Sequence, residues 1–361
     1  MTSLPTQPVK GMRDILGTQA RAKKRIEFII SQTAQKYGFE PMYVPIVENL
    51  SVLTAKGGAG EEAGKELYTF EDQSKRKLGL RFEFTTSLAR VMVGNPELPK
   101  PIKTLNVGTV YRYDNPQALR YREFTQADGD IIGVKNESAE LELICLSIEV
   151  LQKIGFDSFY VRVNDRRIVN ELLKLGKVPA EKTNEALRIL DKLDKIGKEG
   201  VEKELQEKNI LTNILDYLDN PLSEIKSAVE NASVTQPLEN LFSFLEKMDK
   251  LQFVKFDPSL VRGLEYYTGI VFELFAGVNV AVGGGGRYDN LIKSLGGPDL
   301  PAVGISFGVD RLMDVFGEKE DTPKLDVYVI PFGNTFNEAF QLTQDLRAQS
   351  LSVEIDLMQR N

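Results

Sequence analysis

The chain has 361 residues, of which 42% are hydrophobic and 27% are charged, the balance of an ordinary globular protein with about two domains. Its formal net charge of −7 and its pI of about 5.1 exclude a general electrostatic attraction to nucleic acid, although a local basic face could still bind one. The chain has no histidine and one cysteine, Cys145, which excludes an internal disulfide, a cysteine-based zinc site and any step that uses a protein imidazole.

No apolar run approaches the ~18 residues that a membrane-spanning helix needs, so no contact with a membrane is expected. The first residues, Met1–Val9, lack the basic and apolar regions of a signal peptide. Cys145 lies in an apolar stretch with helical spacing, where a buried packing role is typical. A cytoplasmic protein is therefore expected.

The first predicted elements are a helix over about 18–37 and a strand over 39–48. Apolar residues at helical spacing indicate the helix, and Gly38 suits its C-terminal end. The strand alternates polar and apolar residues, but Pro45 restricts it to the edge of a sheet or to a bulge.

A hairpin is predicted next, with strands over 68–72 and 78–84 joined by the basic turn Lys75-Arg76-Lys77. Such a turn is typical of a solvated tip. Glu83 lies near the end of the second strand, and its spacing alone favours a surface position. A helix is predicted to begin near Ser87.

The stretch over 107–133 is predicted as two strands joined by a short loop at Asn115–Arg120, because Asn-Pro opens turns. Side chains alternate along a strand, so Arg112 and Asp114 share one face of the first strand. On the second strand, one face carries basic, aromatic, amide and acidic side chains: Arg122, Phe124, Gln126, Asp128 and Asp130.

This polar face allows two interpretations. An aromatic ring flanked by guanidinium groups, as at Phe124, suits stacking on a flat heterocycle, and the forked arginines suit phosphate, so the face could be a nucleotide site. The water-facing side of an antiparallel sheet is polar by default and accounts for the pattern equally well.

The middle of the chain is predicted to be mainly helical. The stretch over 139–154 carries an apolar face and reads as a buried helix, and 159–163 is a short strand. Between about 165 and 250, apolar residues keep helical spacing among many charges, which indicates a helical insertion whose charged faces are solvated.

The stretch Arg262-Gly263-Leu264-Glu265-Tyr266-Tyr267 precedes two predicted strands, over 270–275 and 278–282. The run Gly283–Gly286 follows. These glycines could allow the backbone to approach a ligand closely, or could form a tight turn between core elements. The spacing does not match a dinucleotide-binding fingerprint.

A strand that leads into a helix is predicted over 301–312, and it places Arg311 in the first helical turn. The helix dipole disfavours a cation there, and a phosphate partner would explain it. A charged linker, Glu318–Lys324, marks a domain boundary. A strand, a helix and a strand are predicted over 325–331, 338–349 and 352–356.

Several of these stretches resemble the class II aminoacyl-tRNA synthetases, and in detail the histidyl-tRNA synthetases in their archaeal and eukaryotic form. Tyr-Arg-Tyr-Asp followed by Arg-Tyr-Arg-Glu-Phe-Thr-Gln resembles motif 2, the strand around Pro45 resembles motif 1, and Pro301–Leu312 resembles motif 3. The stretch Arg262–Tyr267 closely resembles the Arg-Gly-Leu-Asp-Tyr-Tyr signature of histidyl-tRNA synthetases and their paralogues.

The resemblance implies an α+β fold, in which a class II antiparallel sheet is flanked by helices. It also implies a division of the chain into a catalytic core over 1–164 and 251–320, a helical insertion over 165–250, and a partial C-terminal anticodon-binding α/β domain over 324–361. In the family the insertion leans on the tRNA acceptor arm, and the motif 1 proline lies at the interface of a homodimer.

The implied activity is the joining of histidine to ATP, with Mg²⁺, and the transfer of histidine to tRNA(His). On the ATP side, the resemblance implies that Arg112 binds the α-phosphate with Asp114 beside it, and that Arg120 contacts the outer phosphates. It implies that Phe124 and Arg311 sandwich adenine. Arg262 would stabilise the transition state, where other class II enzymes place a metal ion.

On the histidine side, the resemblance implies that Glu83, Gln126 and Asp130 hold the amino group and the ring of the substrate. Arg81-Phe82-Glu83-Phe84-Thr85 resembles the Arg-Pro-Glu-x-Thr segment of the family. Tyr266 and Tyr267 would close the imidazole pocket. Bacterial members more often have Glu at the position of Asp130. No protein metal site is implied.

The alternative is a non-catalytic paralogue, such as the regulatory subunit of ATP phosphoribosyltransferase, which binds histidine and a partner enzyme. Such paralogues usually lose the arginines on the ATP side, which are all present here: Arg112, Arg120, Arg262 and Arg311. A different class II synthetase is opposed by the signature at Arg262–Tyr267, and a metal-dependent hydrolase lacks ligands.

Overall fold

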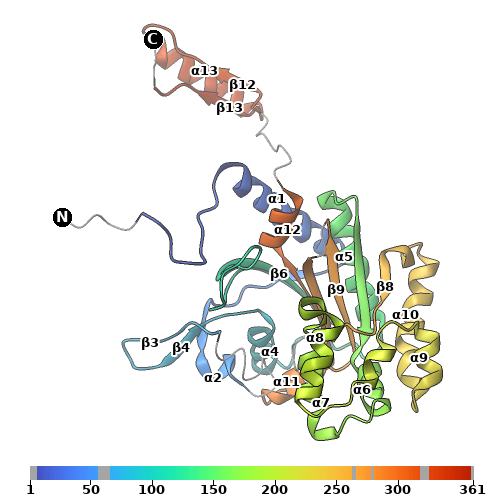
Figure 1. Ribbon diagram of the computed structural model, residues 1–361. Helices are drawn as coiled ribbons and strands as arrows, with labels where there is room; N and C mark the ends of the chain where they lie inside the picture. The colour runs from blue at the N-terminus through green and yellow to red at the C-terminus, as the bar shows by residue number, and fades with distance from the viewer. Residues whose placement is uncertain (1–5, 56–65, 262–265, 278–279, 318–324, 359–361) are drawn as a thin grey trace. The chain divides into compact units, whose positions relative to one another are not determined.

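The computed structural model describes residues 6–55, 66–261, 266–277, 280–317 and 325–358, and the contacts within the chain divide it into two units, Met1–Gly317 and Glu318–Asn361. Within the described residues, the first unit is built on an eight-stranded sheet (Figure 1). The strands, in spatial order, are β1 (Glu40–Pro41), β5 (Ile102–Tyr111), β6 (Glu123–Ile132), β11 (Ala302–Gly308), β10 (Ala281–Arg287), β9 (Ile270–Ala276), β7 (Phe159–Asp165) and β8 (Val254–Phe256).

Neighbouring strands of this sheet are antiparallel except at its two edges, where β1 runs parallel to β5 and β8 runs parallel to β7. The central hairpin, β5 with β6, keeps its register without a break from the pair Ile102 and Ile132 to the pair Tyr111 and Glu123. The predicted α+β class, with an antiparallel sheet flanked by helices, is confirmed.

One face of the sheet is covered by three helices, α1 (Gly17–Lys36), α5 (Ser138–Ile154) and α12 (Val309–Phe316). Alternation along β6 explains why: Ala127 and Ile131 are fully or almost fully buried in the apolar cluster that these helices share with the sheet. The polar residues between them, Gln126, Asp128 and Asp130, therefore point to the opposite face of the sheet.

A separate three-stranded sheet is formed by β2 (Val47–Asn49), β4 (Lys77–Leu80) and β3 (Thr69–Glu71), with α2 (Leu50–Leu53) and α4 (Thr85–Gly94) beside it. The predicted hairpin at β3 and β4 is confirmed. The single strand predicted over 39–48 is wrong, because β1 and β2 belong to different sheets. Pro41 and Pro45 have no N–H to donate, which prevents a continuous hydrogen-bonded strand.

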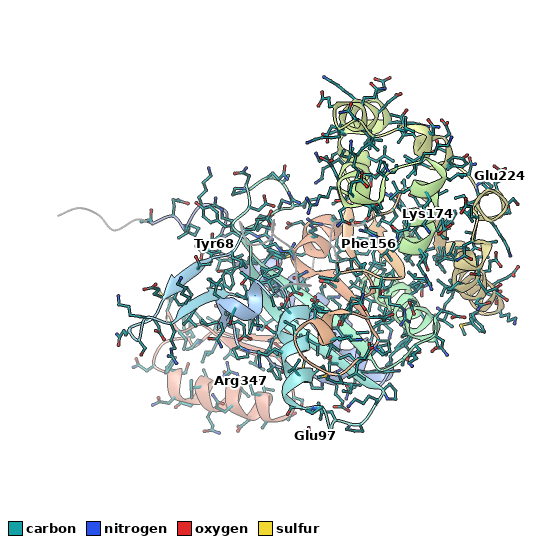
Figure 2. The ribbon with its side chains drawn as sticks, turned by 90° about the horizontal axis from the view of Figure 1, so that it is seen from below. Tyr68, Glu97, Phe156, Lys174, Glu224 and Arg347 are labelled. Carbon is teal, nitrogen blue, oxygen red and sulfur yellow. The ribbon has the colours of Figure 1, made fainter. Side chains whose placement is uncertain are left out.

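The segment between β7 and β8 is helical, as predicted, and is grouped on the β8 side of the sheet (Figure 1). Figure 2 labels Lys174 and Glu224 in this segment. Its buried residues, such as Leu190 and Leu241, join the same apolar cluster as the sheet. Its helices are α6 (Arg166–Leu175), α7 (Thr183–Leu190), α8 (Leu193–Glu207), α9 (Leu222–Ala228) and α10 (Gln236–Lys247), with 3₁₀ turns at Ala180–Lys182, Asn213–Tyr217, Ala232–Thr235 and Leu251–Phe253.

The glycine run Gly283–Gly286 lies inside β10, so the interpretation as a turn is wrong. Of the strand predicted over 278–282, positions 278 and 279 lie outside the described residues, and β10 begins at Ala281. A Cβ atom on Gly283 would lie 2.7 Å from the carbonyl oxygen of Ser306 on β11, and one on Gly285 would collide with the carbonyl oxygen of Gly304. The glycines therefore permit the close approach of neighbouring strands. The short helix α11 (Leu291–Ser294) follows β10.

The second unit contains a strand, a helix and a strand, as predicted: β12 (Val327–Val329), α13 (Phe336–Ala348) and β13 (Val353–Ile355). The two strands pair in parallel. Among the described helices of both units, none combines the length and the apolar character needed to cross a membrane.

Candidate active site

A cavity of about 600 Å³ lies against the polar face of the sheet in the first unit. Every predicted site residue that the structure describes lines this cavity: Glu83, Arg112, Asp114, Arg120, Phe124, Gln126, Asp130, Tyr266, Tyr267 and Arg311. Arg262 lies outside the described residues, but Val261 and Tyr266, which precede and follow that gap, both line the cavity. Residues far apart in the sequence therefore meet in one space.

One part of the cavity, which we call the arginine end, is formed by Arg112, Arg120, Phe124 and Arg311. The Nε atom of Arg112 donates to the carbonyl oxygen of Phe82 at 3.0 Å, and its guanidinium carbon lies 5.2 Å from the centre of the Phe124 ring. Arg120 forms an ion pair of 3.1 Å with Asp114. Arg112 and Asp114 lie beyond the last residue of β5, rather than on the strand as predicted.

Arg311 lies in the first turn of α12, as predicted, and is held by the main chain. Its Nε atom donates to the carbonyl oxygen of Leu119 at 3.1 Å, and Nη1 donates to that of Ala281 at 3.0 Å. These carbonyls belong to the loop after β5 and to the start of β10. The contacts place the guanidinium group of Arg311 where α12, β10 and the loop after β5 meet.

The opposite part, which we call the acid end, is formed by Glu83, Gln126, Asp128 and Asp130, all of which are buried. The carboxylate of Glu83 accepts from the backbone N–H groups of Thr85 and Thr86, at 2.5 and 2.7 Å, so it also caps the start of α4. Asp130 accepts a hydrogen bond from the hydroxyl of Tyr288. Burial, together with the charge of Glu83, raises the pKa of Asp130 to about 7.

Two buried acceptor atoms at the acid end, Oε1 of Gln126 and Oδ2 of Asp130, have no hydrogen-bond partner within the described residues. Buried polar atoms are almost always paired, so these atoms indicate a ligand that brings N–H donors. A strand rises about 3.4 Å per residue, which puts Asp130 about 20 Å along β6 from Phe124. The cavity can therefore hold an anionic group and a group with N–H donors at separate places.

Arg13, near the N-terminus, links the two elements that form the arginine end. It donates to Asp310 of α12 at 2.9 Å and to the Tyr121 hydroxyl at 2.7 Å. Asp310 in turn accepts from the backbone N–H of Thr125 on β6 at 2.6 Å. These contacts fix the start of α12, and hence Arg311, against β6.

A family model described as histidyl-tRNA synthetase matches residues 11–312. The chain belongs to the histidyl-tRNA synthetase family. Among similar proteins, a histidine–tRNA ligase of Pyrobaculum aerophilum is 38% identical over 370 aligned residues, which cover 99% of this chain and 87% of that protein. A histidine–tRNA ligase 1 of Bacillus anthracis is 34% identical, over 98% of this chain and 87% of that protein.

Solved structures of the histidyl-tRNA synthetase family share the fold. The enzyme of Nostoc sp. PCC 7120 superposes with a TM-score of 0.85 at 23% identity, covering 99% of this chain and 88% of that one. A Bacillus halodurans structure described as an ATP phosphoribosyltransferase regulatory subunit/histidyl-tRNA synthetase superposes with a TM-score of 0.83 at 23% identity, covering 98% and 93%.

Among the residues that line the cavity but were not predicted as site residues of this family member are Asp128, Arg162, Tyr288 and Ser306. Asp128 was placed on the polar face of β6, but no role followed from that position. Tyr288 follows the glycine run, whose sequence drew attention only to backbone freedom. Arg162 pairs with Asp194 at 2.8 Å and with Asp257 at 2.6 Å, which joins the helical segment to the stretch before Val261.

Proposed function

We propose that the chain is a histidine–tRNA ligase, which joins histidine to ATP with release of pyrophosphate and then transfers the histidine to tRNA(His). The observation that carries this proposal is the division of one cavity into an arginine end and an acid end with two unsatisfied acceptors. ATP brings phosphates, and histidine brings an ammonium group and ring N–H groups. The two substrates of the family thus match the two ends of the cavity.

In the first step, an oxygen of the histidine carboxylate attacks the α-phosphorus of ATP. An O–P bond forms, and the bond to the bridging oxygen breaks with release of pyrophosphate. The carboxylate is already ionised at neutral pH, so the step requires positioning and charge stabilisation more than a general base. We assign this stabilisation to Arg112, at the α-phosphate, and to Arg262.

On the ATP side, we assign the stacking of adenine to Phe124 and Arg311, and the outer phosphates to Arg120 beside Asp114. Mg²⁺ would enter with ATP and neutralise charge on its phosphates. Within the described residues, no group of three or more His, Cys, Asp or Glu side chains is arranged to hold a metal ion.

On the histidine side, we assign the amino group and the ring to Glu83, Gln126 and Asp130, and the closure of the imidazole pocket to Tyr266 and Tyr267. The two tyrosine rings lie in contact, with centres 4.9 Å apart, and both side chains are largely buried. The two rings are inclined by 60° to each other, and aromatic surfaces beside buried acceptors suit a substrate ring that carries N–H groups.

The other parts of the chain are assigned by their place in the family. We propose catalytic parts over 1–164 and 251–320, an insertion over 165–250 that leans on the tRNA acceptor arm, and an anticodon-binding unit over 324–361. We further propose a homodimer in the cytoplasm, where tRNA is charged. The exposed apolar side chains of Tyr43, Ile46 and Val47 support an interface at the motif 1 segment.

The decisive experiment is ATP–pyrophosphate exchange with the purified chain and each amino acid in turn. Exchange that depends on histidine alone is expected, because the acid end offers acceptors for both the ammonium group and the ring. Histidine binding without any exchange would instead favour a regulatory paralogue. Charging of tRNA(His) and the molecular mass in solution test the second step and the homodimer.

A further inference from the structure

Asp128 and Ser306 line the cavity but have no role in the reaction described above. They lie directly opposite each other on β6 and β11. The Ser306 hydroxyl donates to Oδ1 of Asp128 at 2.6 Å and accepts from Nε2 of Gln126 at 2.6 Å. The three side chains therefore form a hydrogen-bonded series that ends at the amide of Gln126.

The one proton of the serine hydroxyl gives this series a direction. A hydroxyl group can donate a single hydrogen bond, and here it donates to Oδ1 of Asp128. The hydroxyl can then only accept from Gln126, so the amide must turn its NH₂ group toward Ser306. The carbonyl oxygen of Gln126 consequently points away from Ser306, and this is the buried Oε1 atom that lacks a partner within the described residues.

The order of residues along β6 indicates which substrate group meets this oxygen. The reacting carboxylate must lie near Arg112, which contacts Phe124, and the ring must extend toward Asp130. The α-amino group is attached to the carbon next to the carboxylate, so it lies between these two places. Gln126 lies between Phe124 and Asp130 on the same face of the strand.

We propose that Asp128 and Ser306 are positioning residues that orient Gln126 to accept a hydrogen bond from the α-ammonium group of the amino-acid substrate. The inference rests on the proposed function, because it takes histidine as the ligand of the acid end. It explains why the amide of Gln126 has this orientation before the substrate binds, which contacts with the substrate do not explain. It also predicts that the effect of each positioning residue depends on whether the ligand has an amino group.

The test is the substitution Ser306→Ala, which removes the link and leaves the amide able to rotate. Binding of histidine is measured by calorimetry and compared with binding of 3-(imidazol-4-yl)propionate, which lacks the α-amino group. A loss of about tenfold is expected for histidine, the size of one hydrogen bond to a charged group, and about twofold or less for the analogue. The KM for ATP should stay unchanged.

Two further variants make the test specific. In Asp128→Asn, the new amide can donate to Ser306 and no longer imposes one orientation on Gln126, so a smaller loss of histidine affinity is expected, again without loss for the analogue. The matched control is Ser147→Ala, because the buried Ser147 hydroxyl bonds to the carbonyl oxygen of Leu143 in α5, outside the cavity lining. It should leave both affinities unchanged.

Unchanged histidine affinity in folded Ser306→Ala overturns the proposal, as does an equal loss for histidine and the analogue, which would mean that Ser306 acts through packing. If thermal melting shows that Ser306→Ala is unfolded, Asp128→Asn is judged by the same two ligands. Failure of the proposed function is visible in the unsubstituted chain, as absence of histidine-dependent exchange. Absence of histidine binding to that chain overturns both.

Discussion

Arg112 and Arg311 at the arginine end of the cavity are held differently from Gln126 and Asp130 at the acid end. Arg112 and Arg311 donate to main-chain carbonyls and are only partly buried. Asp130 and Gln126 are buried, are bound by other side chains, and each keep one acceptor atom without a partner in the described part of the chain.

Because of this difference, we expect the arginine end to act mainly on the rate of adenylate formation and the acid end to act mainly on the affinity for histidine. A main-chain carbonyl neither ionises nor rotates away, so it holds a guanidinium group in place before the substrate arrives, as transition-state stabilisation requires. An unpaired buried acceptor is unfavourable until a ligand satisfies it, so the acid end contributes to the binding of the ligand. Substitutions at the arginine end should therefore mainly lower kcat, and those at the acid end should mainly raise the KM for histidine.

The largest effect is expected at the arginine end. Arg112→Ala removes a positioned donor to the charge that develops on the α-phosphate, which costs about 3–4 kcal/mol, or about 100- to 1000-fold in the rate of adenylate formation. Single-turnover measurements should show this loss with histidine affinity almost unchanged. Arg76→Ala is the control, because Arg76 lies in an exposed turn and pairs with Asp72 at 2.6 Å. Near-normal single-turnover rates in Arg112→Ala would contradict the assignment of rate to the arginine end.

Asp130→Asn should instead weaken the binding of histidine at the acid end. The substitution replaces the Oδ2 acceptor by an amide NH₂ group, which cannot accept from the substrate, so histidine affinity should fall about 10- to 100-fold while the rate at saturating histidine changes less. Asp299→Asn serves as the control, since Asp299 is exposed and pairs with Lys293. A loss of rate without a loss of affinity would show that the two ends do not divide the work in this way.

Asp130 also makes the stability of the ligand-free chain depend on pH. With its pKa raised to about 7, folded Asp130 keeps a proton between about pH 4 and 7 that the unfolded chain has lost, so the stability that this group contributes falls as pH rises through that range. The fall is at most about 1.4 kcal/mol per pH unit. Urea unfolding of the ligand-free chain and of Asp130→Asn should show the variant gaining relative stability between pH 5 and 7. Parallel pH profiles would refute this.

A smaller effect is expected from Tyr288→Phe, which removes the donor to Asp130 but keeps the ring. Without this bond the Asp130 carboxyl group can turn away from the ligand, and because one hydrogen bond contributes about 1 kcal/mol, histidine affinity should fall by no more than about fivefold. Tyr160→Phe is the matched control, because Tyr160 stacks on Phe275 and does not line the cavity. Calorimetry on both variants decides between this contact and a general effect of losing a hydroxyl group.

Local pattern was enough to predict most of the helices and strands and the polar face of β6. Alternation alone put Phe124, Gln126, Asp128 and Asp130 on one side, and a strand cannot place them otherwise without a bulge. The same reasoning failed over 39–48, where two prolines divide the stretch between two sheets, and at Gly283–Gly286, where a strand looks like a turn because glycine carries no side chain to alternate.

The contacts within the site were decided only by the tertiary structure. Ser306 reaches Asp128 across 178 positions of sequence because β11 pairs with β6 in one register. Tyr288 follows β10 and reaches Asp130 across 158 positions because β10 pairs with the other side of β11. No periodicity within a single strand specifies which strand will lie beside it or in which register. Alternation along the sequence was therefore sufficient to identify the groups that share one face of β6, and the pairing of strands determined which of them bond to one another and which atoms remain for a ligand.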